Sequence, residues 1–267
     1  QWRLKPGAYL TTIDADSEGE EGIYYVMTMS ELSKLGTHKD VSQWASYFQF
    51  SAEGNMIDEA TGARTGYNIF NPIEQPCTFD LDAFKKIIKQ FRQDHRQPPT
   101  KDKRMLISAN ALLAHSFLLA GEVFNQADWV DHARKLLDFL FKEIKLNIDQ
   151  VYLDDVIYLL FALLKSPNHL SCTTEIWDIL IDRFYDHGQG GLWFSQESHQ
   201  TPISRIKDIY DRAEPAANAM FIQIGLDMAK KHHDMRYFEF ASDVIYAFLG
   251  SIKSSSMGAD GYWLGVL

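Results

Sequence analysis

The chain of 267 residues contains two cysteines, Cys77 and Cys172, which stand far apart and show no paired spacing. This scarcity excludes a disulfide framework, and no cysteine–histidine pattern typical of a zinc site is present. No apolar run approaches the ~20 residues that a membrane-spanning helix requires. We therefore expect a cytoplasmic protein with no membrane insertion, no metal site and no cofactor.

Positive charge is also scarce, since 26 Lys and Arg residues face 36 Asp and Glu residues and the net charge is −10. Nucleic-acid binding usually needs a basic face, so we expect no nucleic-acid partner. A glycine-rich phosphate loop is lacking, because residues 188–191 lead into a predicted strand and not into a helix. No serine-centred nucleophile motif is present.

Two regions of different character follow one another along the chain. Residues 1–75 are rich in turns and aromatic side chains, and they predict strands at 7–10 and 22–26 and short helices near 30–35 and 41–48. We assign 1–75 to a strand-rich rim segment and 76–267 to one continuous domain of helical hairpins. Apolar residues three and four positions apart predict helices over 81–95, 105–124, 127–145, 154–166, 173–185, 215–231 and 234–251.

An internal repeat indicates how these helices are arranged. The aromatic–Ala–aliphatic pattern of residues 129–137 recurs at residues 237–245, and short Gly–aromatic segments recur between the predicted helical hairpins. Repeated helical hairpins predict a solenoid or an α/α toroid, and interposed strands favour the toroid. The alternative is an irregular helical bundle.

The densest cluster of polar residues lies at 208–218, directly before a buried helix. Asp211 and Glu214 are the best pair for general acid–base catalysis, which needs two carboxylates in unlike environments. The alternative is helix capping plus a local salt bridge to Arg212. Tyr210 either stacks on a sugar or packs in the fold. Pro215 suits the first helical position, so these polar groups should lie at the positive end of the helix.

Asp154 and Asp155 are the first residues of the most apolar predicted helix. One of them is expected to be its N-cap, and the second is free to point into a toroid cavity and bind a ligand. Asn110 and Asn218 stand at the starts of buried helices. Each is either a ligand contact or a partner for backbone groups.

The acidic segment 14–21 offers Asp14, Asp16 and Glu18, with Gly19 at the sixth position. An EF-hand requires a bidentate carboxylate at position twelve, but that residue is Tyr25, so this calcium site is excluded. A calcium site of another kind, a solvated hairpin loop and a rim for a polyhydroxylated ligand remain as alternatives, the last because a carboxylate accepts several hydroxyl hydrogen bonds.

Several short motifs together resemble one family. Residues 14–19 and 21–28 match its acidic run and the following strand, with Met27 where the family usually has tryptophan. Residues 211–218 match its motif before a helix, with Arg212 for glycine and Ala216 for serine. Shorter matches occur at 53–55, 68–69, 103–112, 153–155 and 190–194. In this combination the chain resembles the spermatogenesis-associated protein 20 family, whose bacterial members are described as thioredoxin-domain proteins.

The resemblance implies a toroid of six helical hairpins, similar to that of N-acylglucosamine 2-epimerases and several glycosidases. It also implies a thioredoxin-like domain and further hairpins ahead of Gln1, so that this chain is a partial toroid with short strands at one rim. A divided toroid exposes apolar helix faces, which predicts a homo-oligomer or association with the missing N-terminal part.

We therefore expect a carbohydrate-binding or carbohydrate-processing domain with an acidic cavity and a sugar ligand. Whether it is an enzyme of the glycosidase or sugar-epimerase kind stays open. The alternative is a non-catalytic scaffold or interaction domain that serves a thioredoxin-like domain.

Overall fold

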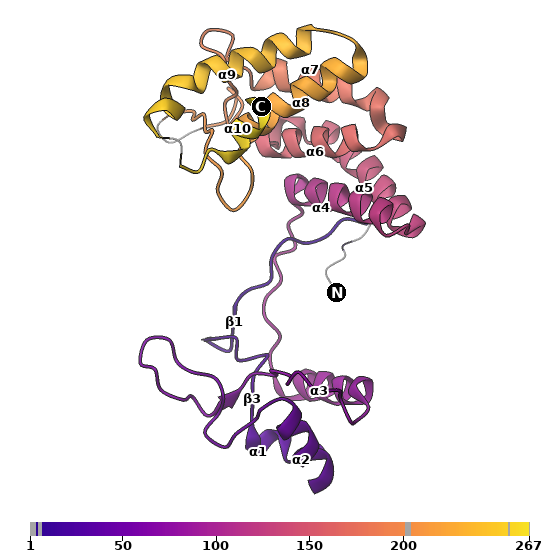
Figure 1. The fold of residues 1–267 in the computed structure, drawn as a ribbon, viewed down its shortest axis with the longest axis vertical. Coiled ribbons are helices and arrows are strands. Elements are labelled where there is room, and N and C mark those ends of the chain that lie inside the picture. Colours follow the sequence, from indigo (N-terminus) through magenta and orange to yellow (C-terminus); the bar gives the residue numbers. More distant parts are fainter. Residues whose placement is uncertain (1–3, 5–6, 201–203, 256, 267) are drawn as a thin grey trace. The chain divides into compact units, whose positions relative to one another are not determined.

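A computed structural model describes residues 4, 7–200, 204–255 and 257–266 (Figure 1). The chain divides into two compact units, one of Gln1–Thr11 with Lys103–Leu267 and one of Thr12–Asp102. The assignment of domains to residues 1–75 and 76–267 stays a prediction. No helix in the described ranges is both long enough and apolar enough to cross a membrane.

The smaller unit contains three helices and four very short strands. The helices are α1 (Met29–Leu32), α2 (His38–Tyr47) and α3 (Leu81–His95), and the strands are β1 (Asp16–Ser17), β2 (Glu20–Glu21), β3 (Met27–Thr28) and β4 (Tyr67–Asn68). Both β1–β2 and β3–β4 pair antiparallel. α1 and α2 each begin with a capping box, in which a threonine and an acidic side chain three residues later bond each other's backbone N–H groups.

An aromatic core holds the smaller unit together. The rings of Phe48 and Phe84 stack with centroids 5.1 Å apart, and Trp44 and Phe70 pack around them. The buried amide of Asn68 joins the surrounding loops, since it accepts hydrogen bonds from two backbone N–H groups and donates to two carbonyls. The fully buried site of Asn68 is therefore a structural junction.

The strands expected at 7–10 and 22–26 are wrong. The acidic segment is itself the hairpin, because Ser17 pairs with Glu20 around a two-residue turn. Glu18 and Gly19 both have positive φ, which is the requirement of the tight hairpin turn that suits the twist of paired strands. Residues 22–25 form a further turn instead of a strand.

The larger unit contains seven α-helices within its described residues. They are α4 (Ile107–Val123), α5 (Ala127–Leu146), α6 (Leu153–Lys165), α7 (Leu170–Arg183), α8 (Ala217–His232), α9 (Arg236–Ser254) and α10 (Asp260–Val266). The first six agree with the predicted segments to within a few residues. α10 was not predicted, because it is short and contains two glycines that weaken its helical pattern.

These helices form two layers of successive hairpins (Figure 1). α4, α6 and α8 pack side by side, and each also packs against the helix that follows it, α5, α7 and α9 respectively. α10 packs against α8 and extends the first layer. A layer of inner helices backed by outer helices is the arrangement of an arc of an α/α toroid. The prediction of a mainly α-helical α/α toroid fold is confirmed. The short strands β1 to β4 belong to the smaller unit, so their predicted place at one rim of the toroid stays a prediction.

Close packing explains two sequence features of this arc. α6 is buried on almost every face, which accounts for its continuous apolar run. α8 and α9 approach closely at Gly225, where an added Cβ would lie 2.7 Å from the Cβ of Ala241 and 2.9 Å from the carbonyl oxygen of Tyr237. Only glycine permits this contact, so Gly225 sets the spacing of the third hairpin.

Candidate functional site

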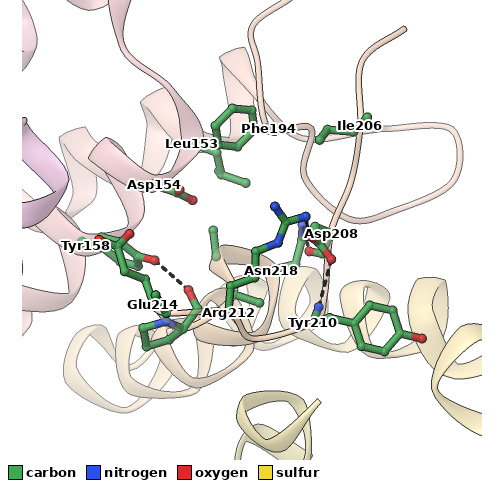
Figure 2. A pocket seen from close by; sticks show the side chains of 14 residues that line it. Leu153, Asp154, Tyr158, Phe194, Ile206, Asp208, Tyr210, Arg212, Glu214 and Asn218 are labelled. Atoms are coloured by element: carbon green, nitrogen blue, oxygen red, sulfur yellow. Dashed lines mark hydrogen bonds and ion pairs between the residues drawn. The ribbon is translucent and has the colours of Figure 1, made fainter. Parts of the chain in front are cut away.

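A pocket of about 280 Å³ lies where α6 and α8 begin (Figure 2). All of its lining residues belong to the larger unit. They are Leu153, Asp154 and Tyr158 of α6, Phe194 and Ile206 of the connection between α7 and α8, and Asp208, Tyr210, Arg212, Ala213, Glu214, Pro215, Ala216, Ala217 and Asn218 around the start of α8. The predicted polar segment therefore does open onto a cavity.

The start of α6 separates the roles of its two aspartates. The carboxylate of Asp155 accepts hydrogen bonds from the backbone N–H groups of Tyr152, at 3.1 Å, and Ser108, at 2.9 Å. It thereby caps α6 and ties the starts of α4 and α6 together. Asp154, by contrast, lines the pocket. The expectation that an aspartate is the N-cap of α6 is wrong, because the N-cap residue is Tyr152 and Asp155 is the third helical residue, which bonds the N–H of the N-cap. The ligand-binding role expected of the other aspartate stays a prediction.

The environment of Asp154 disfavours its charged form. Burial, together with the nearby carboxylates of Glu214 and Asp155, raises the pKa of Asp154 to about 6, and Arg212 opposes this only partly. A carboxyl group with this pKa exchanges its proton near neutral pH. It therefore has the property expected of a general acid.

Asp154 and Glu214 are free to contact a ligand. Neither side chain has a hydrogen-bond or ion-pair partner among the residues that the structure describes. Tyr158, which lies beside them, donates its hydroxyl hydrogen to the carbonyl oxygen of Pro215 at 2.7 Å (Figure 2). Burial raises the pKa of Tyr158, so this hydroxyl stays protonated and holds the start of α8 against α6.

Asp211 occupies a different position from Glu214. Its two carboxylate oxygens accept hydrogen bonds from the backbone N–H groups of Ala216 and Gly261, each at 2.8 Å. It is not among the lining residues of the pocket. The catalytic role of Asp211 stays a prediction, but these contacts favour the alternative that it stabilises the turn before Pro215.

Tyr210 and Arg212 are also bound to protein groups. The hydroxyl of Tyr210 lies within hydrogen-bond distance of the carbonyl oxygens of Ser251 and Ser255 at the end of α9, and its ring points away from the pocket centre (Figure 2). This position favours packing over sugar stacking. Arg212 forms an ion pair with Asp208 at 2.6 Å, which is a local salt bridge of the kind named in the alternative interpretation.

Asn110 and Asn218 are buried and play the same structural role in two hairpins. The amide of Asn218 accepts the N–H of Leu192 and donates to the carbonyl oxygens of Leu192 and Asp208. Asn110 accepts the N–H of Tyr9 and donates to the carbonyl oxygens of Tyr9 and Leu106. Because both amides are satisfied by backbone groups, a ligand-binding role for them stays an untested prediction.

Asp14, Asp16 and Glu18 belong to the β1–β2 hairpin of the smaller unit. The carboxylate of Asp14 accepts the N–H of Asp16 at 3.1 Å, and Glu18 occupies the tight turn. The expectation that Asp14, Asp16 and Glu18 contact a polyhydroxylated ligand stays a prediction. No group of three or more His, Cys, Asp or Glu side chains that could hold a metal ion occurs in the described parts of the chain.

The apolar wall of the pocket was not predicted from the sequence. Phe194 and Ile206 line it, and Tyr152 stacks behind Phe194 with ring centroids 5.2 Å apart. Phe194 belongs to the Gly–aromatic segment that was noted as a repeat, so the signal was present. Nothing in the sequence showed that this segment meets the start of α6, where Leu153 donates its N–H to the carbonyl oxygen of Phe194.

The sequence matches no protein-family model and no curated protein. Membership of the spermatogenesis-associated protein 20 family therefore stays a prediction. Among solved structures, the chain is similar to a GH76 α-mannanase from Bacteroides thetaiotaomicron, with 13% identity and a TM-score of 0.44 over 58% of this chain and 47% of that chain. It is also similar to cellobiose 2-epimerase from Bacillus thermoamylovorans, with 10% identity and a TM-score of 0.44 over 92% of this chain and 66% of that chain. The chain thus spans about half and about two thirds of these two proteins, and neither likeness bears on its own reaction.

Proposed function

We propose that the larger unit is a carbohydrate-binding or carbohydrate-processing domain, and that the pocket at the starts of α6 and α8 is its site. One observation carries the proposal. Asp154 and Glu214 line the same cavity without a protein partner in the described residues, and Asp154 has a pKa raised to about 6. Two carboxylates in unlike environments are the usual requirement for acid–base chemistry on sugars.

In this proposal Asp154 takes the acid role and Glu214 the base role, in place of the predicted pair of Asp211 and Glu214. Asp154 is half buried and holds a proton more readily than an ordinary carboxyl group. Glu214 is exposed at the pocket edge, where its charge raises the pKa of Asp154. Both groups also accept hydrogen bonds from sugar hydroxyls, so the same pair serves binding even where no reaction follows.

Calorimetric titration of the purified protein with a panel of neutral sugars tests this proposal. We expect at least one sugar to bind, and Asp154→Asn and Glu214→Gln to weaken its binding by about tenfold, as for a lost charge-assisted hydrogen bond. Glu239→Gln, an exposed change on α9, is the matched control and should bind as the wild type does. Wild-type affinity in both pocket variants would refute the site.

The second candidate function is that of an interaction domain, as in the predicted association with a thioredoxin-like domain or with further copies of the chain. Exposed apolar side chains around the α4–α5 turn favour it, since Val123 is 71% and Phe124 is 63% exposed. Light scattering over a wide concentration range tests self-association. A monomer at all concentrations, combined with sugar binding that depends on Asp154, would favour the first function.

A further inference from the structure

The aromatic wall of the pocket identifies the class of ligand. We propose that Phe194 is a stacking platform, and that the pocket takes a neutral pyranoside whose C–H face lies on this ring. The inference rests on the proposed function, because it concerns the same pocket. It adds a specificity-determining residue and excludes anionic sugars.

The backbone holds Phe194 in place from both sides. Its N–H donates to the carbonyl oxygen of Ile206 at 2.8 Å, and its carbonyl oxygen accepts the N–H of Leu153 at 3.0 Å. Leu153 is the first residue of α6 and directly precedes Asp154. The ring and the acidic group are therefore fixed in the same short stretch of structure.

Other rings support one side of Phe194. Tyr152 stacks on it with an interplanar angle of 25°, and His199 packs against Tyr152 with centroids 4.9 Å apart. The N–H of Tyr152 is bound by the carboxylate of Asp155, and the Nε2 atom of His199 lies 2.9 Å from the carbonyl oxygen of Asp149. Phe194 lines the pocket and is 36% exposed, whereas Tyr152, which stacks on it, is not a lining residue.

The neighbouring side of the pocket is polar and acidic. In Figure 2, Asp154 and Glu214 lie on the left, while Phe194 and Ile206 lie along the top. In its ionised form, which predominates above pH 6 for Asp154, a carboxylate accepts hydrogen bonds and cannot donate them. The cation in the lining, Arg212, is already paired with Asp208. This wall therefore suits a ligand that presents hydroxyl donors, and it repels carboxylates and phosphates.

A pyranose ring has both required surfaces. Its C–H groups form an apolar face that packs on an aromatic ring, and its hydroxyls project from the ring edge as donors. A sugar phosphate or a uronate would bring a negative charge next to Asp154 and Glu214. The two walls together therefore select a neutral pyranoside.

The test uses methyl glucopyranoside, methyl mannopyranoside and methyl galactopyranoside as neutral probes, with glucuronate and glucose 6-phosphate as anionic ones. Calorimetry gives the affinities, and saturation-transfer NMR from the aromatic protons shows which sugar protons contact a ring. We expect Phe194→Leu to bind the best neutral probe about tenfold more weakly and to lose the transfer to its C–H face. Phe194→Tyr should keep both, and Phe124→Leu at the exposed α4–α5 turn is the control.

The outcomes separate this inference from the proposed function. If a neutral probe binds through Asp154 but Phe194→Leu leaves its affinity and the saturation transfer unchanged, the platform is wrong and the function stands. If an anionic probe binds as tightly as the neutral ones, the selectivity is wrong. If no probe binds the wild-type protein, both proposals fail. Retention of binding by Phe194→Tyr shows that a loss in Phe194→Leu reflects the ring and not misfolding.

Discussion

The starts of α6 and α8 both supply carboxylates to one region of the larger unit, but they use them differently. At α6, Asp155 is bound to two backbone N–H groups while Asp154 has no partner in the described residues. At α8, Asp211 is likewise bound to two backbone N–H groups, while the side chain of Glu214 has no partner among the residues that the structure describes. Each helix start thus combines one structural carboxylate with one that faces the pocket.

This pairing has a physical reason. Asp154, whose pKa is raised by burial, is poorly solvated and has no hydrogen-bond partner among the described residues, so its position depends on the backbone that carries it. Asp155 and Asp211 fix the backbone beside Asp154 and Glu214. The four predictions below test this division between structural and pocket-facing polar groups, from the largest expected effect to the smallest.

Asn218→Ala should have the largest effect. It leaves the N–H and carbonyl of Leu192 and the carbonyl of Asp208 without their partner in a buried site, which should lower the free energy of unfolding by about 3 kcal/mol. Urea denaturation measures the change. Asn110→Ala is the matched variant and should cost a similar amount. If it costs almost nothing, the two amides are not equivalent.

Asp211→Asn should lower the free energy of unfolding by about 1 to 2 kcal/mol. An amide offers one acceptor instead of two, so either Ala216 or Gly261 loses the partner of its N–H group. A thermal melt measures the loss, and calorimetry should show unchanged sugar affinity. Lost binding at unchanged stability would instead restore Asp211 to the catalytic pair.

Asp154→Asn should stabilise the protein at pH 7. The folded-state pKa of Asp154, about 6, lies above the usual value of 3.8, so the folded protein holds the proton more tightly between these values. The contribution of the protonated Asp154 side chain to folding stability is complete below about pH 4 and is lost as pH rises through 6. At pH 7 the ionised side chain is therefore unfavourable in the folded state, and asparagine removes this cost. The full shift corresponds to about 3 kcal/mol, but partial exposure reduces the gain to on the order of 1 kcal/mol.

Denaturation at pH 4, 5, 6 and 7 measures this effect. The stability of the wild type relative to Asp154→Asn should fall as pH rises, and Asp155→Asn should instead be destabilised throughout because it removes a cap. Parallel pH profiles for the wild type and Asp154→Asn would contradict the raised pKa.

Tyr210→Phe should have the smallest effect. The hydroxyl bonds to the carbonyl oxygens of Ser251 and Ser255 are long, at 3.3 and 3.2 Å, and exposed. Their removal should cost on the order of 0.5 kcal/mol, and sugar affinity should not change. A strong loss of binding would place the ring of Tyr210 in the ligand site after all.

Much of the fold was predictable because helix periodicity is local. The starts of α6 and α8 were marked by acidic residues and by Pro215, and the buried run of α6 was plain in the sequence. The expectation that Pro215 is the first helical residue is wrong, because α8 begins at Ala217 and Pro215 precedes its N-cap, Ala216. The hairpin at Glu18 and Gly19 was not predicted, because the acidic composition of 14–21 suggested a loop and the turn depends on backbone angles.

The site was less predictable because it depends on contacts between distant segments. The sequence indicated two aspartates at α6 but could not show which one caps the helix, since Asp155 is recognised by its bond to Ser108 on α4. The sequence also favoured Asp211 over Asp154 as the catalytic acid. The structural role of Asp211 was hidden because the N–H of Gly261, which its carboxylate binds, belongs to α10, a helix that was not predicted.

The contacts of Asp211 have a consequence for how the larger unit opens. Its carboxylate joins the first turns of α8 and α10, and its own N–H bonds to the carbonyl oxygen of Gly258. α10 is the last described helix and would otherwise fray as an independent segment. Because one side chain holds both helix starts, the amide protons of Ala216 and Gly261 should become exposed in a single cooperative opening. In native-state hydrogen exchange, the last helix and the acidic rim of the pocket then behave as one foldon.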